Sequence, residues 1–183
     1  MWTLTCGLVF GATYYSLRQG ANDPQLQMVR DMRNSLNNGA LAESFQQNVN
    51  PVDIKNSLSP FYMIFSEDHT VLASSGRLNN ETLQVPSGVL EYVVNSAPSM
   101  VGGAEYRVTL EPQKGVRLAA VFKVAPLNTP GAQHHIVMAA RNLIEVDSRI
   151  QYIQWVCAGV WLAGLLAIAG YSALSQRPEK RTA

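Results

Sequence analysis

The stretch YRVTLEPQKGVRLAAVFKVA, residues 106–125, decides the fold class of this 183-residue chain. Polar and apolar residues alternate over Tyr106–Leu110, as is typical of a strand with one buried face. The next five residues, EPQKG, predict a turn. Val116–Ala125 predicts a long strand whose middle is entirely apolar. Two such strands joined by a short turn indicate an antiparallel hairpin.

Further strands lie on both sides of this hairpin. Phe61–Phe65 and Val71–Ala73 are rich in β-favouring residues, and the polar SEDH between them predicts a second hairpin. His135–Ala140 predicts the last strand. Gly76–Pro86, between the two hairpins, is predicted as a polar loop.

Helical segments accompany the strands. Asp23 as N-cap and Pro24 at the first helical position predict the start of a long amphipathic helix. Its apolar residues recur at three- and four-residue spacing: Leu26, Val29, Met32, Leu36 and Ala40. Short helices are predicted over Val52–Leu58 and Gly88–Ser96. The order of elements predicts an α+β domain with an antiparallel sheet and helices packed on one face.

Apolar stretches flank this domain. Residues 155–174, WVCAGVWLAGLLAIAGYSAL, carry no charge and are long enough to cross a hydrocarbon layer of about 30 Å as a helix. Residues 2–17 predict a second, uncleaved span, and the basic residues after residue 174 predict a cytoplasmic C-terminus. We therefore expect a two-pass protein of the cytoplasmic (inner) membrane, divided into a span at 1–18, an extracytoplasmic domain at 19–150, a span at 151–174 and a cytoplasmic tail at 175–183.

Two sets of residues on the membrane helices predict packing. The helix that enters the second span has apolar residues at alternating three- and four-residue spacing, which predicts a signalling or homodimer seam. The seam residues are Leu143, Val146, Ile150 and Ile153. Small residues at four-residue spacing predict close packing of the spans, either with each other or between two copies. These residues are Gly7, Gly11, Gly159, Ala163 and Ala167.

The composition and motifs exclude several functions. Fourteen Lys and Arg against thirteen Asp and Glu, without a basic patch, give no reason to expect a nucleic-acid partner. The three histidines, His69, His134 and His135, lack metal-ligand spacing, so no metal site is expected. Because nucleophile-elbow, Walker and dinucleotide motifs are absent from the sequence, we expect neither an enzyme nor a cofactor.

Basic residues on or beside the strands are candidate ligand-binding groups. They are Arg107, Lys123 and Arg141. A pocket for a carboxylate or phosphate needs such side chains, because arginine binds planar anions through two parallel hydrogen bonds. The alternative is that they are solvent-facing residues of an antiparallel sheet, with Arg107 on the face of Thr109 and Lys123 on that of Val121.

Four segments resemble the extracytoplasmic PAS-like or Cache-like sensor domains of bacterial membrane-bound histidine kinases. They are FYMIFSEDHTVLASSG (61–76), VPSGVLEYV (85–93), YRVTLEPQKGVRLAAVFKV (106–124) and IVMAARNLIEVDSRI (136–150), the last running into a membrane helix. The resemblance implies a PAS/Cache-like sheet with a long N-terminal helix and a place in two-component signal transduction. It does not carry over catalysis, because the sequence holds no phosphoacceptor-histidine or ATP-binding region.

Two functional hypotheses follow. The first is a membrane-anchored sensory or ligand-binding module without its own catalytic output, which signals through a partner such as a sensor kinase or another membrane protein. The second is a structural or interaction scaffold of the cell envelope with no small-molecule ligand. Both place the chain in the lipid bilayer, and the seam makes a homodimer one form of either.

Overall fold

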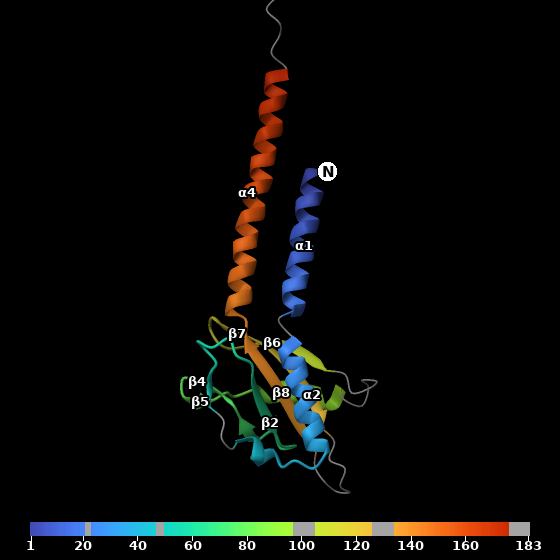
Figure 1. Cartoon of the computed structure of the whole chain (residues 1–183), viewed down its shortest axis with the longest axis vertical. Helices are drawn as coiled ribbons and strands as arrows, with labels where there is room; N and C mark the ends of the chain where they lie inside the picture. The colour runs from blue at the N-terminus through green and yellow to red at the C-terminus, as the bar shows by residue number, and fades with distance from the viewer. Residues whose placement is uncertain (21–22, 47–49, 97–104, 126–133, 176–183) are drawn as a thin grey trace, which may run out of the picture. The chain divides into compact units, whose positions relative to one another are not determined.

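Figure 1 shows the computed structural model of the chain. It describes residues 1–20, 23–46, 50–96, 105–125 and 134–175. The chain divides into two compact units, one formed by Gln19–Glu145 and the other by Met1–Arg18 with Val146–Ala183. The first unit is an α+β domain, as predicted, and the second contains helical segments from both ends of the chain.

A five-stranded antiparallel sheet forms the centre of the α+β domain, in the spatial order β3-β2-β8-β7-β6. The strands are β2 (Phe61–Phe65), β3 (Val71–Ser74), β6 (Tyr106–Gln113), β7 (Val116–Ala125) and β8 (His135–Asn142). Both predicted hairpins are present, and β8 joins them by pairing with β2 on one side and β7 on the other. The last strand of the domain therefore occupies the middle of the sheet.

One face of the sheet is covered by α2 (Asp23–Asn37) and the 3-10 helix η1 (Ala42–Gln46). The buried residues of this layer are Leu26, Val29, Met32, Leu36, Ala42, Ile64, Ala73, Val121, Ala125, Val137 and Ala139. Four residues of the apolar stripe predicted for the long helix, Leu26, Val29, Met32 and Leu36, are thus its buried face over β7 and β8 (Figure 1), whereas the fifth, Ala40, lies beyond the end of the helix at Asn37. Gly39, at a φ of +91°, follows the end of this helix, where a left-handed residue is common.

The opposite face is covered by α3 (Ser87–Ser96) and by a three-stranded sheet of β1 (Val52–Asp53), β4 (Gly76–Leu78) and β5 (Glu81–Thr82), in the order β1-β4-β5. The buried residues here are Ile54, Phe61, Met63, Phe65, Leu83, Leu90, Val93, Val116, Leu118, Ala120, Phe122, Ile136, Met138 and Ala140. The prediction that helices pack on one face is therefore wrong. The reason lies in the apolar middle of β7, whose successive side chains point to opposite faces and require a cover on each.

The segment Val52–Leu58, predicted as a helix, begins instead with a two-residue strand, β1 (Val52–Asp53). The Val52 N–H donates to the Ser75 carbonyl at 2.7 Å, and the Ile54 N–H donates to the Arg77 carbonyl at 2.9 Å. Parallel pairing with β4 thus holds Val52 and Asp53 in an extended conformation, and residues 54–56 form a turn, so the predicted helix does not form.

The segment Gly76–Pro86, predicted as a loop, contains a small hairpin of β4 (Gly76–Leu78) and β5 (Glu81–Thr82). Asn79 and Asn80 form its turn, with φ values of 55° and 68°. Left-handed backbone at both central residues is the geometry of the type I′ turn, which asparagine tolerates better than most residues. The pair Asn79-Asn80 was the available sequence signal for this hairpin.

The second unit contains most of α1 (Trp2–Gly20) and α4 (Ile144–Ser175). Among the helices in the described part of the chain, α4 alone is long and apolar enough to cross a membrane. Residues 1–18 are largely helical, but threonine, tyrosine, serine and Arg18 lower the hydropathy of α1. A membrane-crossing helix is therefore supported at α4, and the predicted two-pass topology is not confirmed.

Within this unit the two helices touch near Trp2. The Trp161 Nε1 donates to the Thr3 Oγ1 at 3.3 Å, and a Cβ added at Gly164 would overlap the Trp2 indole ring. The predicted packing residues are Gly7, Gly11, Gly159, Ala163 and Ala167. A Cβ added at any of these three glycines would meet no described atom within 4 Å. The described contact between the helices thus includes Gly164, and packing of the predicted set, either between the two spans or between two copies, stays a prediction.

Candidate functional site

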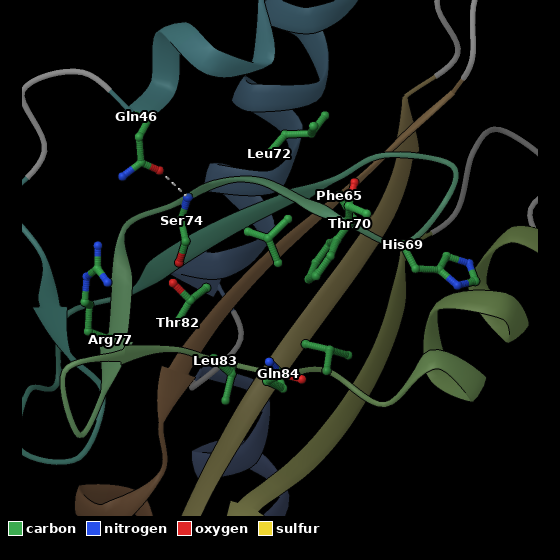
Figure 2. A pocket seen from close by; sticks show the side chains of 12 residues that line it. Gln46, Phe65, His69, Thr70, Leu72, Ser74, Arg77, Thr82, Leu83 and Gln84 are labelled. Atoms are coloured by element: carbon green, nitrogen blue, oxygen red, sulfur yellow. Dashed lines mark hydrogen bonds between the residues drawn. The ribbon is translucent and has the colours of Figure 1, made fainter.

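A pocket of about 650 Å³ opens beside β3, at one edge of the large sheet (Figure 2). Its walls come from η1, the β2–β3 hairpin, the β4–β5 hairpin and the chain that follows β5. The lining residues are Gln46, Phe65, His69, Thr70, Val71, Leu72, Ser74, Arg77, Thr82, Leu83, Gln84 and Val85. Sites for small molecules typically have volumes of about 300 to 1,000 Å³, so this pocket has a suitable size.

Arg77 is held by the middle strand of the three-stranded sheet. Its backbone lies opposite Asp53 in the parallel β1–β4 pair and opposite Thr82 in the antiparallel β4–β5 pair. Its carbonyl accepts the hydrogen bond from Ile54 already described. The backbone of Arg77 is therefore fixed on both sides, while its side chain is exposed to the pocket.

The Arg77 guanidinium has no hydrogen-bond or ion-pair partner among the residues that the structure describes. Acidic side chains are also absent from the described lining. His69, the other basic residue of the lining, lies on the opposite side of the pocket from Arg77 (Figure 2). Asp53, the neighbour of Arg77 in the β1–β4 pair, lines the adjoining smaller pocket and forms no ion pair with Arg77, so no carboxylate of the described lining pairs with this positive charge.

Hydrogen bonds hold the rim near Arg77. The Gln46 Oε1 accepts a hydrogen bond from the Ser74 backbone N–H at 2.8 Å (Figure 2). The Ser74 hydroxyl donates to the Gly76 carbonyl at 3.0 Å. The Gln46 amide nitrogen keeps two N–H donors without a partner in the described part of the chain. The rim is thus ordered and still has donors for a ligand.

The remaining lining combines the polar side chains of Thr70, Thr82 and Gln84 with five apolar ones. Phe65 and Leu83 are almost fully buried, at 1% and 3% exposure, and Leu72 and Val85 are half-buried. A molecule in this pocket therefore meets hydrogen-bond donors at one end and aliphatic or aromatic side chains beside them. Such a site fits a small amphipathic ligand better than a bare ion.

Arg77 also borders a second, smaller pocket of about 340 Å³. Asp53 lines this second pocket, where its carboxylate accepts hydrogen bonds from the Asn56 side chain at 2.7 Å and the Lys55 N–H at 3.0 Å. These hydrogen bonds, with that from Asn56 the stronger influence, lower the pKa of Asp53 and keep it charged. An anion is therefore better accommodated in the first pocket than in the second.

Lys123, one of the predicted ligand-binding residues, is buried against Glu105 rather than lining the pocket. The Glu105 Oε1 lies 3.2 Å from the Lys123 Nζ and 2.8 Å from the Arg30 Nε. The hydrogen bond from Arg30, helped by that from Lys123, outweighs burial and lowers the pKa of Glu105 to about 2. The same hydrogen bond raises the pKa of Arg30. This ion-pair cluster connects α2 to β7.

The other two predicted residues lie on the same face of the sheet as Lys123 but in separate surroundings. Arg107 is exposed on the edge strand β6, opposite Val121. The Arg141 Nε donates to the Leu58 carbonyl at 2.7 Å, and its Nη2 lies 3.3 Å from the Glu145 Oε2. The described pocket includes none of the three, and their role in ligand binding stays a prediction.

The histidines are dispersed as well. His69 lies in the turn of the β2–β3 hairpin with a φ of 62°, whereas His134 and His135 lie at the start of β8. Within the described ranges, no group of three His, Cys, Asp or Glu side chains is placed to hold a metal ion.

Asn142, the last residue of β8, connects three parts of the domain and was missed by sequence reasoning. Its side chain is buried, and its Nδ2 donates to the Ile54 carbonyl at 2.8 Å and to the Lys55 carbonyl at 3.1 Å. Its Oδ1 accepts a hydrogen bond from the Ile144 N–H at 2.9 Å. One amide thus joins the end of β8, the turn after β1 and the first turn of α4.

The predicted helix seam requires one correction. Leu143 lies between β8 and α4, is 2% exposed, and donates its N–H to the Arg117 carbonyl at 2.8 Å. It therefore belongs to the domain core rather than to the helix. Val146, Ile150 and Ile153 do lie on α4, with Ile150 buried and the other two half-buried. Their role in a homodimer or partner contact stays a prediction.

Comparison with protein-family models gave no match, and comparison with curated proteins gave none either. The resemblance to PAS-like or Cache-like domains therefore stays a prediction. The function has to be argued from the pocket, from Asn142 and from the apolar helix.

Proposed function

We propose that this chain is a membrane-anchored sensory module whose α+β domain binds a small ligand outside the cytoplasm. Through α4, the ligand state of the domain would bias a partner protein in the membrane, such as a sensor kinase or a second copy. The observation that carries the proposal is the junction at Asn142. The domain's central strand leads into the apolar helix with only Leu143 between them.

A continuous set of hydrogen bonds supports this direction of signalling. The Arg77 carbonyl accepts from the Ile54 N–H, and the Ile54 carbonyl accepts from the Asn142 side chain. The Asn142 side chain in turn accepts from the Ile144 N–H at the start of α4. A connected path does not by itself establish coupling, which requires an element with two states that both ends bias. The proposed element is the first turn of α4, either bonded to Asn142 or released from it.

The remaining parts of the proposal have separate support. The length and hydropathy of α4 support membrane anchoring. The basic residues after residue 174 support a cytoplasmic C-terminus and hence an extracytoplasmic domain. The order of α2, the β2–β3 hairpin, α3 and the strands β6 to β8 supports the PAS-like or Cache-like assignment, with η1, β1 and the β4–β5 hairpin as additional elements.

Amide hydrogen exchange on the full chain in lipid nanodiscs tests the proposal. We expect Asn142→Ala to accelerate exchange about tenfold or more both at residues 52–58 and at residues 144–150, because the same amide stabilises both. Asn95→Ala on the exposed side of α3 is the matched control and should change neither region. A small molecule that raises the melting temperature should also slow exchange at residues 144–150. A small molecule that raises the melting temperature but leaves amide exchange at residues 144–150 unchanged would contradict the sensory role.

The alternative is a scaffold that docks on another envelope protein. The observation that favours it is the edge strand β6, an eight-residue strand with exposed residues and, among the described residues, no strand paired to its outer side. Cross-linking in membranes distinguishes the two functions. A stoichiometric partner captured through β6, together with no stabilising small molecule, would support the scaffold.

A further inference from the structure

We infer that the pocket beside β3 binds a small organic carboxylate that has an apolar body and no amino group. The inference rests on the proposed function and specifies its ligand class and site. Arg77, Gln46 and Thr82 would hold the carboxylate, while Leu83 and Val85 would contact the apolar body.

The state of Arg77 is the first argument. Lys123 and Arg141 use their charged groups within the domain, against Glu105 and against the Leu58 carbonyl, respectively. The guanidinium of Arg77 has no such partner in the described part of the chain, although its backbone is fixed by pairing on both sides. A guanidinium offers five N–H donors in a planar fork that matches a carboxylate.

Two further donors lie near this guanidinium. Thr82 is the cross-strand partner of Arg77 in the β4–β5 hairpin, so the two side chains project from the same face as neighbours (Figure 2). Gln46 is oriented by its hydrogen bond to the Ser74 N–H, which leaves its amide N–H donors available. Three donor groups from separate elements therefore line the same polar wall.

The rest of the lining decides the ligand class. Because none of the described lining residues is acidic, the ammonium of an amino acid would have no counter-charge and would be costly to bury. Inorganic phosphate would leave the apolar surface of Leu83 and Val85 without contact. A carboxylate with a short aliphatic chain or an aromatic ring satisfies both parts of the pocket (Figure 2).

Ligand-observed NMR titrations of the full chain in nanodiscs, with empty nanodiscs as the reference for lipid partitioning, test the inference. The probes are butyrate, benzoate, benzamide, benzylamine and inorganic phosphate. We expect saturable binding of butyrate or benzoate, at least about tenfold weaker binding of benzamide, and no saturable binding of benzylamine. Saturation by phosphate but by neither carboxylate would overturn the ligand class.

Arginine variants test the site. Arg77→Gln should weaken carboxylate binding at least about tenfold, and Arg77→Lys should weaken it less, because lysine keeps the charge but lacks the fork. Lys114→Gln in the exposed β6–β7 turn removes the same charge elsewhere and should leave binding unchanged. Identical circular dichroism spectra of the variants establish that they are folded. Unchanged binding in Arg77→Gln, or loss of binding in Arg107→Gln instead, would overturn the site.

The inference and the proposed function fail in different ways. If a carboxylate binds at Arg77 and leaves exchange at residues 144–150 unchanged, the site stands and the sensory role fails. If Asn142→Ala accelerates exchange in α4 but no carboxylate in the panel binds, the proposed coupling at Asn142 is supported and the proposed carboxylate site at Arg77 is refuted.

Discussion

The two faces of the large sheet are closed in different ways. The fifteen-residue helix α2, with the short η1 after it, covers one face and is connected to β7 by the cluster of Arg30, Glu105 and Lys123. The other face is covered by a ten-residue helix and by strands of two or three residues, and a pocket remains at its edge. One long helix gives a continuous cover. Several short elements leave space between them, and their mutual hydrogen bonds determine whether that space persists.

Removing the Asn142 side-chain amide is the strongest test of this difference between the two faces. The amide is buried on the face that the short elements cover, and it binds the turn after β1. Asn142→Ala leaves the Ile54 and Lys55 carbonyls and the Ile144 N–H without their partner. We expect a loss of about 3 kcal/mol in the free energy of unfolding. Urea unfolding in detergent, followed by circular dichroism, measures it. A loss below about 1 kcal/mol would show that other contacts hold the short elements.

A glycine at the start of β4 tests how closely the small sheet lies on the large one. A Cβ at Gly76 would overlap the ring of Phe61, which is 1% exposed and has no room to move. We expect Gly76→Ala to destabilise the domain by about 2 kcal/mol through overpacking. Gly88→Ala in α3 is the control, because an added Cβ there meets no described atom within 4 Å. The control should be neutral or slightly stabilising, and equal losses in both variants would refute the packing argument.

The ion-pair cluster gives the corresponding test on the α2 face. Glu105→Gln should cost about 1 to 2 kcal/mol, because the largely buried Lys123 loses its charged partner. The pKa of Glu105 is lowered from 4.5 to about 2, so its contribution is complete above pH 4.5 and is lost as the pH falls towards 2. The difference in stability between wild type and variant should therefore shrink over this range in pH-dependent unfolding curves. A difference that stays constant would show that the charge of Glu105 is not responsible.

The smallest expected effect is that of Asn80→Gly, in the β4–β5 turn that lines the second, smaller pocket. Asn80 has a φ of 68°, which glycine adopts without steric cost. Asn80→Gly should therefore raise the free energy of unfolding by a few tenths of a kcal/mol or leave it unchanged, roughly the difference between Asn and Gly in a type I′ turn. Asn80→Val should lower it by about 1 to 2 kcal/mol, because a β-branched side chain is strained at this φ. Thermal unfolding of both variants measures the contrast, and equal stabilities would argue against this turn.

The large sheet was predictable because its strands carry local signals. Val116–Ala125 and Phe61–Phe65 are long β-favouring runs bounded by turn residues, and the structure places strands at both. The amphipathic stripe of α2 was predictable for the same reason. That elements cover both faces of the sheet was not predictable. The apolar middle of β7 indicates that the strand is buried but does not indicate which element lies on each side.

The candidate site was largely hidden from the sequence because its contacts are distant along the chain. Two- and three-residue strands are too short to show a period, and β1 pairs with a segment more than twenty residues away. Arg77 therefore lay in a segment predicted as loop. From the sequence, Lys123 was a candidate for ligand binding, but in the structure it forms an ion pair with Glu105. The hydrogen bonds of Asn142 to Ile54 and Lys55 cannot be predicted from the residues next to it in sequence.

The position of β8 has a consequence for biosynthesis. The β2–β3 and β6–β7 hairpins are local and need only their own residues, but the sheet that joins them needs β8. Pairs such as Phe61 with Ala140 bring together residues far apart in sequence, which raises the contact order and slows folding. Until β8 is made, the edges of β2 and β7 are both unpaired and open to aggregation. The domain is thus complete only when synthesis has reached the residues just before α4, the most apolar helix of the described chain.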